Sequence, residues 1–225
     1  MRVLASADVH GRWPVYEWLL DVASQRHVDA LVLAGDLLGS VGGPGNPEEA
    51  WREEAEAVTN LLDGAGVPVL YIMGNDDLVA LNPLSERVQS IHGHRVELGG
   101  FAFVGYQYSQ PFMGGIFEKP ECEIKADLAS FASLLDVRTV FVSHSPALGI
   151  LDLCSGEQRI GSNSIRELLM TNPFRAHIHG HVHEGFGRHG KHFNVAAAGG
   201  ARAILLNLET LQHQVVGLEH LPPQL

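Results

Sequence analysis

The chain opens with Arg2-Val3-Leu4-Ala5-Ser6-Ala7-Asp8-Val9-His10-Gly11, a short apolar run that ends in polar side chains. An apolar run of this length is typical of a buried strand. Asp8 and His10 then come directly after the point where that strand ends. A second run, Ala30–Ala34, leads in the same way into Gly35-Asp36. The sequence therefore predicts buried strands that deliver carboxylates and imidazoles at their carboxyl ends.

The length and composition indicate a folded globular protein. The chain has 225 residues, of which 45% are apolar and 18% are charged, which is a balance that globular proteins show and disordered ones do not. A chain of this size can bury a sizeable core. Since no repeat, low-complexity tract or linker divides it, residues 1–225 are expected to form a single domain.

The net charge of −11 argues against an extended nucleic acid as the partner. An acidic surface repels a polyphosphate backbone. A small anionic substrate remains compatible with it, because bound metal ions can reverse the field inside a cleft.

Cysteine usage and hydropathy favour a cytoplasmic protein. Cys122 and Cys154 are far apart and form no CxxC pattern, so a disulfide framework and a thiolate zinc site are both disfavoured. No apolar run approaches the roughly 20 residues that span a membrane, and the N-terminal run is too short for a signal peptide. We expect neither a membrane partner nor a secreted location, and the sequence gives no indication of the oligomeric state.

The first half alternates apolar runs with amphipathic segments, which is typical of β-α-β units and a parallel sheet. The patterns predict a hairpin of residues 95–98 with 101–105, and loops over residues 39–45 and 107–123, the second long enough to suggest a functional role. Helices are expected over residues 14–26, 47–63, 128–135 and 162–170. Further strands are expected over residues 67–73, 139–143, 176–179, 193–197, 203–208 and 214–218.

Polar side chains follow the ends of several expected strands, and the carboxyl ends of strands in α/β sheets form one ligand-binding rim. Glycines precede some of them and allow close approach of the backbone. The convergent set contains Asp8, His10, Asp36, Asn75, His144 and His181. Strand alternation places His177, His179, His181 and His183 on similar faces, so spacing alone leaves open which of these histidines are ligands.

Carboxylates, an amide and imidazoles without cysteine suit divalent Mn, Fe, Co, Ni or Zn in five- or six-fold coordination. Two such ions about 3.5–4 Å apart, bridged by a carboxylate, clamp the attacking and leaving oxygens of a phosphoryl displacement. Two divalent ions against Asp8, Asp36 and a bridging hydroxide leave a net charge of about +1, which attracts a phosphate.

The chain resembles the calcineurin-like metallophosphoesterases. The resemblance rests on blocks that occur in the family's order and extend from residue 8 to residue 183: Asp8-Val9-His10-Gly11, Gly35-Asp36, Gly74-Asn75-Asp76-Asp77, Ser143-His144-Ser145-Pro146 and Gly180-His181-Val182-His183. Residues 181–187 are most similar to the small Icc-like branch, which includes the class III cyclic-nucleotide phosphodiesterases.

The resemblance implies an α/β fold, a four-layer α/β/β/α sandwich of two mixed sheets flanked by helices. It also implies that one divalent ion is held by Asp8, His10 and His183, that a second is held by Asn75, His144 and His181, and that Asp36 bridges them. His177 and His179 are then expected to have a structural role or to contact the metal-binding side chains without binding metal themselves.

Asp76 departs from the family pattern, which has a histidine directly after the motif asparagine and an acid after that histidine. Here Asp76 takes the histidine's position and Asp77 takes the acid's position. Asp76 and His10 are the candidate catalytic residues, although Asp76 and Asp77 are equally well explained as caps of a helix over residues 78–81. A carboxylate beside the phosphate disfavours a dianionic monoester more than a monoanionic diester.

The expected function is therefore metal-dependent hydrolysis of a small phosphate ester, most of all a phosphodiester, by a hydroxide that bridges two divalent ions. The alternative is a non-catalytic binding or scaffold protein that retains the fold and the metal site, a possibility that Asp76 favours mildly.

Overall fold

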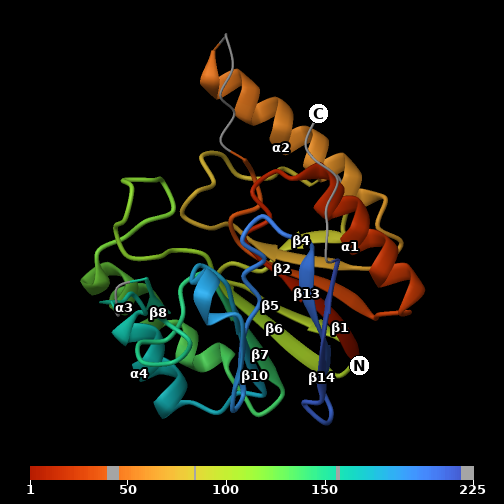
Figure 1. The fold of residues 1–225 in the computed structure, drawn as a ribbon. Coiled ribbons are helices and arrows are strands. Elements are labelled where there is room, and N and C mark those ends of the chain that lie inside the picture. Colours follow the sequence, from red (N-terminus) through yellow and green to blue (C-terminus); the bar gives the residue numbers. More distant parts are fainter. Residues whose placement is uncertain (40–45, 84, 156–157, 219–225) are drawn as a thin grey trace.

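The computed structural model describes residues 1–39, 46–83, 85–155 and 158–218, which form two sheets stacked face to face with helices on the outer faces (Figure 1). The first six-stranded sheet has the order β14-β13-β1-β2-β3-β4, in which β1 to β4 are parallel and β13 runs antiparallel to β1. Its strands are β1 (Arg2–Ser6), β2 (Ala30–Ala34), β3 (Val69–Ile72), β4 (Val88–Ser90), β13 (Arg202–Asn207) and β14 (His213–Gly217).

The second six-stranded sheet has the order β11-β12-β10-β7-β6-β5 and is also mixed. Its central strands are parallel, whereas β5 and β11 pair antiparallel with their neighbours at the two edges. Its strands are β5 (Arg95–Leu98), β6 (Phe101–Tyr106), β7 (Thr139–Ser143), β10 (Ala176–His179), β11 (Gly187–His189) and β12 (His192–Asn194). A separate short hairpin pairs β8 (Leu153–Cys154) with β9 (Gln158–Arg159).

Successive residues of each strand point to opposite faces of its sheet, so the apolar core consists of three layers: one between each sheet and its helices, and one between the two sheets. Helices α1 (Trp13–Gln25) and α2 (Pro47–Asp63) pack on the first sheet, and α3 (Glu121–Ala129) and α4 (Asn163–Thr171) pack on the second. Side chains such as Leu70, Phe103 and Phe193 fill the space between the sheets. The expected four-layer sandwich is thus confirmed.

Local signals at the helix ends explain why most helices were predictable. The Asn46 side chain accepts the N–H of Glu48 at 3.2 Å at the start of α2, and the Ser162 hydroxyl accepts the N–H of Ile165 at 3.2 Å at the start of α4. Such caps satisfy N–H groups that lack a partner inside the helix. The helices expected over residues 14–26, 47–63 and 162–170 are confirmed to within one residue. No helix in the described part of the chain is long and apolar enough to cross a membrane.

The helix expected over residues 128–135 is wrong in its bounds. The α-helix begins at Glu121 and ends at Ala129, and residues 131–134 form a separate 3-10 helix. Pro120 has the fixed φ that suits a helix start, and Glu121 and Glu123 suit the positive end of the helix dipole. The expected loop over residues 107–123 therefore ends at Pro120, and of the loop expected over residues 39–45, residues 40–45 lie outside the described residues.

We expect Phe103→Ala to lower the free energy of unfolding by about 3–5 kcal/mol, because Phe103 is fully buried between the sheets and its removal leaves a cavity. The matched control is Phe112→Ala, which removes a phenyl ring that is 72% exposed and should change stability by no more than about 0.5 kcal/mol. Urea unfolding followed by circular dichroism measures both. Equal losses in the two variants would contradict the assignment of Phe103 to the core.

Candidate metal centre

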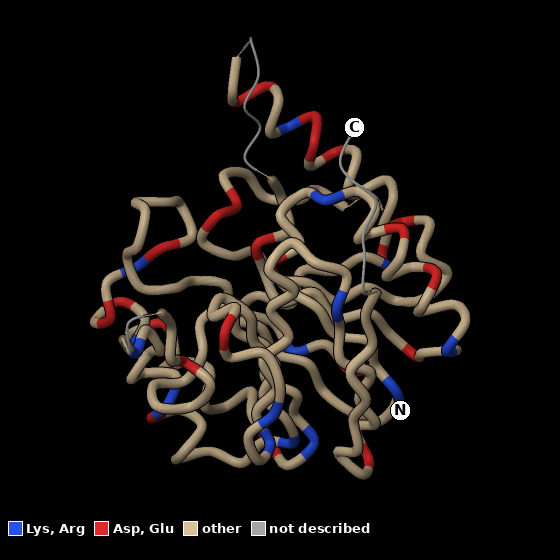
Figure 2. Tube along the Cα trace, viewed as in Figure 1, with Lys and Arg blue, Asp and Glu red and all other residues tan. Residues whose placement is uncertain are grey.

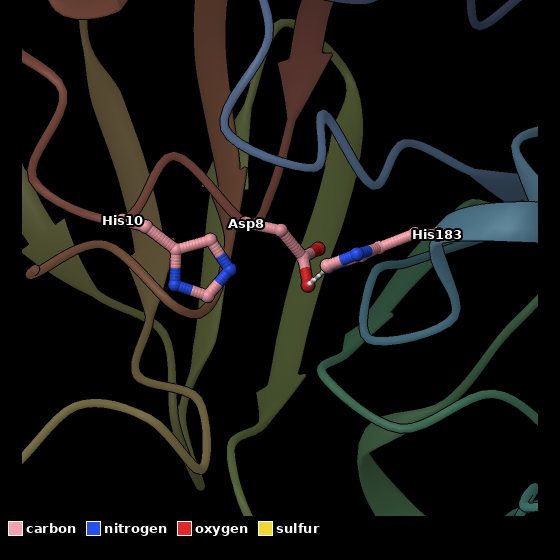
Figure 3. A group of neighbouring side chains, drawn as sticks. All are labelled: Asp8, His10 and His183. Atoms are coloured by element: carbon pink, nitrogen blue, oxygen red, sulfur yellow. Dashed lines mark hydrogen bonds and ion pairs between the residues drawn. The ribbon is translucent and has the colours of Figure 1, made fainter.

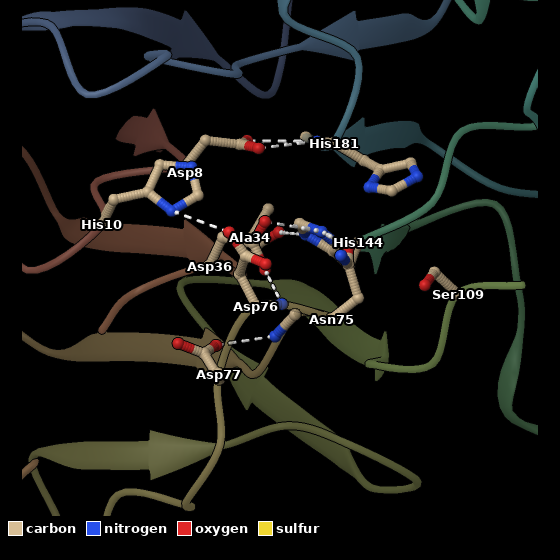
Figure 4. A network of polar contacts seen from close by, with 12 residues as sticks. Asp8, His10, Ala34, Asp36, Asn75, Asp76, Asp77, Ser109, His144 and His181 are labelled. Atoms are coloured by element: carbon tan, nitrogen blue, oxygen red, sulfur yellow. Dashed lines mark hydrogen bonds and ion pairs between the residues drawn. The ribbon is translucent and has the colours of Figure 1, made fainter. Parts of the chain in front are cut away.

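The carboxyl ends of strands from both sheets meet at one rim, where the polar side chains predicted from the sequence lie together (Figure 4). Asp8 and Asp36 follow β1 and β2 of the first sheet, while His144 and His181 follow β7 and β10 of the second. Two groups of candidate ligands therefore combine a carboxylate from the first sheet with a histidine from the second sheet.

Asp8, His10 and His183 form the first group, with one possible ligand atom of each within 4.8 Å of the others. The Nε2 of His183 lies 3.2 Å from Oδ1 of Asp8, and the His10 and His183 rings are 5.9 Å apart at an angle of 77° (Figure 3). The hydrogen bond to the buried Asp8 carboxylate raises the pKa of His183. One carboxylate and two imidazoles thus face a common point, as the ligands of a divalent cation must.

Asp36, His144 and His181 form the second group, also within 4.8 Å. The Nε2 of His144 lies 2.9 Å from Oδ1 of Asn75 and 3.3 Å from Oδ2 of Asp36. The other ring nitrogen, Nδ1, lies 2.9 Å from the carbonyl oxygen of Ala34. A backbone carbonyl at Nδ1 is the arrangement that orients metal-binding imidazoles and directs Nε2 at the ion. Asn75 thus joins this second group.

Asp36 also belongs to a third group with His10 and Asp76, whose ligand atoms again lie within 4.8 Å of one another. Asp36 is therefore shared between the two sides of the site, which is the position that a bridging carboxylate requires.

The electrostatics of the buried pair Asp36 and His144 suit a cation. Burial alone lowers the pKa of His144, but attraction to Asp36 outweighs it and raises this pKa to about 10. Burial alone raises the pKa of Asp36, but the same attraction lowers it to about 2. In the metal-free protein the imidazole therefore holds a proton that offsets the carboxylate, and a divalent ion would take the place of that proton.

His181 is electrostatically different from His144. Burial, reinforced by the neighbouring His144, lowers the pKa of His181 to about 4. The imidazole is consequently neutral near pH 7, which is the form that binds a metal ion.

Backbone conformation sets the candidate ligands apart from the rest of the chain. Among the described residues, eight that are not glycine have positive φ, and four of them are candidate ligands: Asp8 (55°), His10 (51°), Asp36 (52°) and His181 (70°). This conformation is uncommon for such residues. Strained residues of this kind cluster at active sites and ligand clamps, and their concentration here supports a ligand-binding role for this rim.

The glycines that precede two candidate ligands are required by close packing. A methyl group on Gly180 would collide with Oδ2 of Asp8, and one on Gly74 would collide with Oδ1 of Asp36. Only glycine lets these backbones approach the carboxylates so closely.

Asp76 lies at the edge of the centre. Its Oδ2 is 3.5 Å from Nδ1 of His10, and its backbone N–H donates to Oδ1 of Asp36 at 2.9 Å. Burial and the charge of Asp36 raise the pKa of Asp76. The structure thus places this predicted catalytic residue beside His10, the other one.

Asp77 has a structural role, and the expected helix over residues 78–81 is wrong. These residues form a loop, so neither Asp76 nor Asp77 caps a helix. The buried Asp77 carboxylate instead accepts the backbone N–H groups of Leu37, Leu38 and Gly74 at 2.7–2.9 Å. It links the turn after β2 to the turn after β3. A helix-capping signal in the sequence cannot reveal such a contact, because it involves residues about 40 positions apart.

His177 and His179 lie in the interior of the second sheet, outside the ligand groups found among the described residues. The Nε2 of His177 is 2.8 Å from the hydroxyl of Ser143, and its Nδ1 is 2.9 Å from Nδ1 of His192. Strand β10 ends at His179, so the alternation ends before His181 and His183, which turn onto the rim.

A cleft of about 550 Å³ opens over the centre. Several of its lining residues had no predicted role, although the length of the loop after β6 was a signal. The residues missed in this way include Gln110, Phe112, Met113, Arg159 and Ile160.

We expect Gly180→Ala to lower the affinity for divalent metal roughly 10–100-fold, because the added methyl group displaces the Asp8 carboxylate. Gly64→Ala, at the distant C-cap of α2 and with ordinary φ, serves as the control. Titration of the metal-free proteins with Mn²⁺, with bound metal counted by atomic emission, measures the effect. Unchanged affinity in Gly180→Ala would show that Asp8 is not a ligand.

The fold is shared with solved structures at low sequence identity. The protein TT1561 of Thermus thermophilus superposes with a TM-score of 0.73 at 16% identity, over 96% of this chain and 98% of that chain. A dimetal phosphatase from Danio rerio gives 0.61 at 13% identity over the same shares. A structure described as a novel archaeal phosphodiesterase gives 0.50 at 12% identity, over 97% of this chain and 100% of that chain. No curated protein matches the chain in sequence.

The family model of the calcineurin-like phosphoesterases matches residues 1–185, most of the chain. Members of this family use two divalent metal ions, and the two facing ligand groups at the rim fit that requirement. The chain belongs to the calcineurin-like phosphoesterase family and is a metal-dependent phosphoesterase.

Proposed function

We propose that residues 1–225 act as one domain that hydrolyses a small phosphodiester at a dinuclear metal centre. The observation that carries the proposal is the pair of ligand groups on either side of Asp36, with the carboxylate of Asp76 at the edge of the same cleft. One structure with this fold is described as a phosphodiesterase and another as a dimetal phosphatase, which agrees with this proposal.

The proposed ligand sets follow the two groups. One ion would be held by Asp8, His10 and His183 and the other by Asn75, His144 and His181, with Asp36 shared between them. When bound, two divalent ions, with manganese as one candidate, would supply a hydroxide nucleophile and stabilise the charge that develops on the phosphoryl oxygens.

Groups of the chain itself hold the proposed metal ligands in place. Ala34 orients His144 through its carbonyl oxygen, and Asp77 fixes the turns that carry Asp36 and Asn75. His10 lies beside Asp76 and lines the cleft, which supports the proposal that it assists the leaving group as well as binding metal.

The carboxylate of Asp76 favours a diester through charge. Two unit charges 4 Å apart interact with about 1 kcal/mol in water and about 4 kcal/mol at an effective dielectric constant of 20. A dianionic monoester suffers this repulsion twice and a monoanionic diester only once. Burial is the main cause that raises the pKa of Asp76, and the charge of Asp36 is the next; the charge of Asp36 also opposes the second charge of a monoester.

The acidic surface agrees with a small substrate rather than a nucleic acid strand. Acidic side chains recur along α2, where Figure 2 shows them in red, and they include Glu48, Glu49, Glu53, Glu54 and Glu56. The cytoplasm remains our proposed location, supported by two free cysteines, Cys122 and Cys154.

We expect metal-dependent hydrolysis of bis(p-nitrophenyl) phosphate that Asp36→Ala reduces to the uncatalysed background, because this variant removes the shared ligand. Asp21→Ala, in an exposed part of α1, is the matched control and should retain full activity. Release of p-nitrophenolate is followed with Mn²⁺, Co²⁺, Ni²⁺ and Zn²⁺, with metal content measured in parallel. Metal-loaded wild-type protein that is inactive with every ion would favour the scaffold alternative.

We expect Asp76→His to raise kcat/KM for the monoester p-nitrophenyl phosphate relative to the diester bis(p-nitrophenyl) phosphate. The variant removes a negative charge and adds an imidazole that can act as a positioned acid, and such an acid typically contributes about 10²–10⁴-fold to the rate. Asp76→Asn separates the two causes, because it removes the charge without adding an imidazole. If neither variant gains on the monoester, the charge argument for diester preference is wrong.

A further inference from the structure

The loop of residues 109–119 is a closed structure that rests on the metal centre. The N–H of Ser109 donates to the carbonyl of Phe117 at 3.1 Å, and the Ser109 carbonyl accepts the N–H of Lys119 at 2.9 Å. At the tip, a methyl group on Gly115 would lie 2.6 Å from the carbonyl oxygen of Asn75. The loop therefore packs directly on the backbone of a proposed metal ligand.

Glu118 fixes the tip of this loop. Its carboxylate accepts three consecutive backbone N–H groups, from Phe112 at 2.9 Å, from Met113 at 2.8 Å and from Gly114 at 2.8 Å. Hydrogen bonds to a charged acceptor are stronger than neutral ones. The tip is consequently ordered before any ligand binds, which lowers the entropic cost of binding.

Two large apolar side chains at this tip are exposed beside the centre. Phe112 is 72% exposed and Met113 is 69% exposed. Both line the cleft, and the Phe112 ring lies 6.3 Å from the ring of His181, edge to face. Phe112 and Met113 are called here the apolar lip. Exposed apolar groups held in place at the rim of a polar site are typical of a ligand-binding wall.

The rest of the cleft lining offers little attraction for a second anionic group. It includes Gln158, Arg159 and Ile160. The guanidinium of Arg159 is already paired with the buried carboxylate of Asp152. Since Asp76 and Glu184 also line the cleft, a substituent that carries its own negative charge would be repelled there.

We propose that the apolar lip binds the organic substituent of the phosphodiester and selects an aromatic one; this inference rests on the proposed function and deepens it. A planar ring packs against the Phe112 ring in an offset or edge-to-face arrangement, and the Met113 sulfur contacts the ring edge. A small alkyl substituent offers these side chains far less apolar surface.

The test compares two diesters that share the p-nitrophenolate leaving group, phenyl p-nitrophenyl phosphate and methyl p-nitrophenyl phosphate. Wild-type protein should prefer the phenyl diester in kcat/KM. In the double variant Phe112→Ala and Met113→Ala, the ratio of kcat/KM for the phenyl diester to that for the methyl diester should fall about five- to tenfold. The fall should come from a higher KM for the phenyl diester, while the kinetics with the methyl diester stay the same. The matched control is Ile116→Ala, in the same loop and 59% exposed but outside the cleft, which should change nothing.

Glu118 is a positioning residue in this proposal and has its own test. Glu118→Ala should lower the aromatic preference while the bound metal stays at the wild-type level, because the tip loses its anchor. Glu118→Gln, which retains the shape and one acceptor oxygen, should restore part of the preference. A loss of metal in Glu118→Ala would instead assign this residue to the integrity of the centre and overturn its role here.

The outcomes separate this inference from the proposed function. The inference is overturned if wild-type protein hydrolyses both diesters without a preference for the phenyl diester, or if the double variant keeps that preference. Either result leaves the proposed phosphodiester hydrolysis intact. Inactivity of the metal-loaded wild-type protein on both diesters overturns the proposed function and the inference with it. A double variant that retains the preference but loses self-association in sedimentation would show that the apolar lip is a subunit interface.

Discussion

Two buried carboxylates, Asp8 and Asp36, impose the constraint on which the rest of this structure depends. They are 0% and 4% exposed, and burying such charges is costly unless each is paired. His183 and His144 supply the partners in the metal-free protein, and two divalent ions would supply them more fully. The positive φ angles and the close approach of Gly74 and Gly180 are the means by which the backbone brings these charges together.

The two-sheet architecture is what makes this pairing possible. The carboxylates follow strands of the first sheet, whereas His144, His181 and His183 follow strands of the second. Of the candidate imidazole ligands, only His10 follows a strand of the first sheet, so most partners of the two carboxylates come from the second sheet. The apolar layer between the sheets, to which Phe103 and Phe193 belong, therefore sets the distance between carboxylates and imidazoles, and the metal centre in turn links the sheets at their rim.

Around this shared centre the chain carries the features on which its proposed selectivity rests. Asp76, at the position where the family resemblance implies a histidine, lies beside His10. The tip that carries Phe112 and Met113 is fixed by Glu118 and rests on Asn75. The cleft is lined both by the Asp76 carboxylate and by the exposed apolar side chains of Phe112 and Met113, and the proposed selectivity rests on these two features.

The buried strands, the capped helices and the polar side chains at strand ends are predictable from the amino-acid sequence, because apolar runs and caps such as Asn46 and Ser162 are local signals. The family's motif order selected His181 and His183, which spacing could not distinguish from His177 and His179. Three features emerge only from the folded chain: Asp77 anchors two turns, α3 begins at Glu121, and Phe112 faces the centre. These features depend on distances between segments far apart in the chain, or on competing local signals that packing resolves.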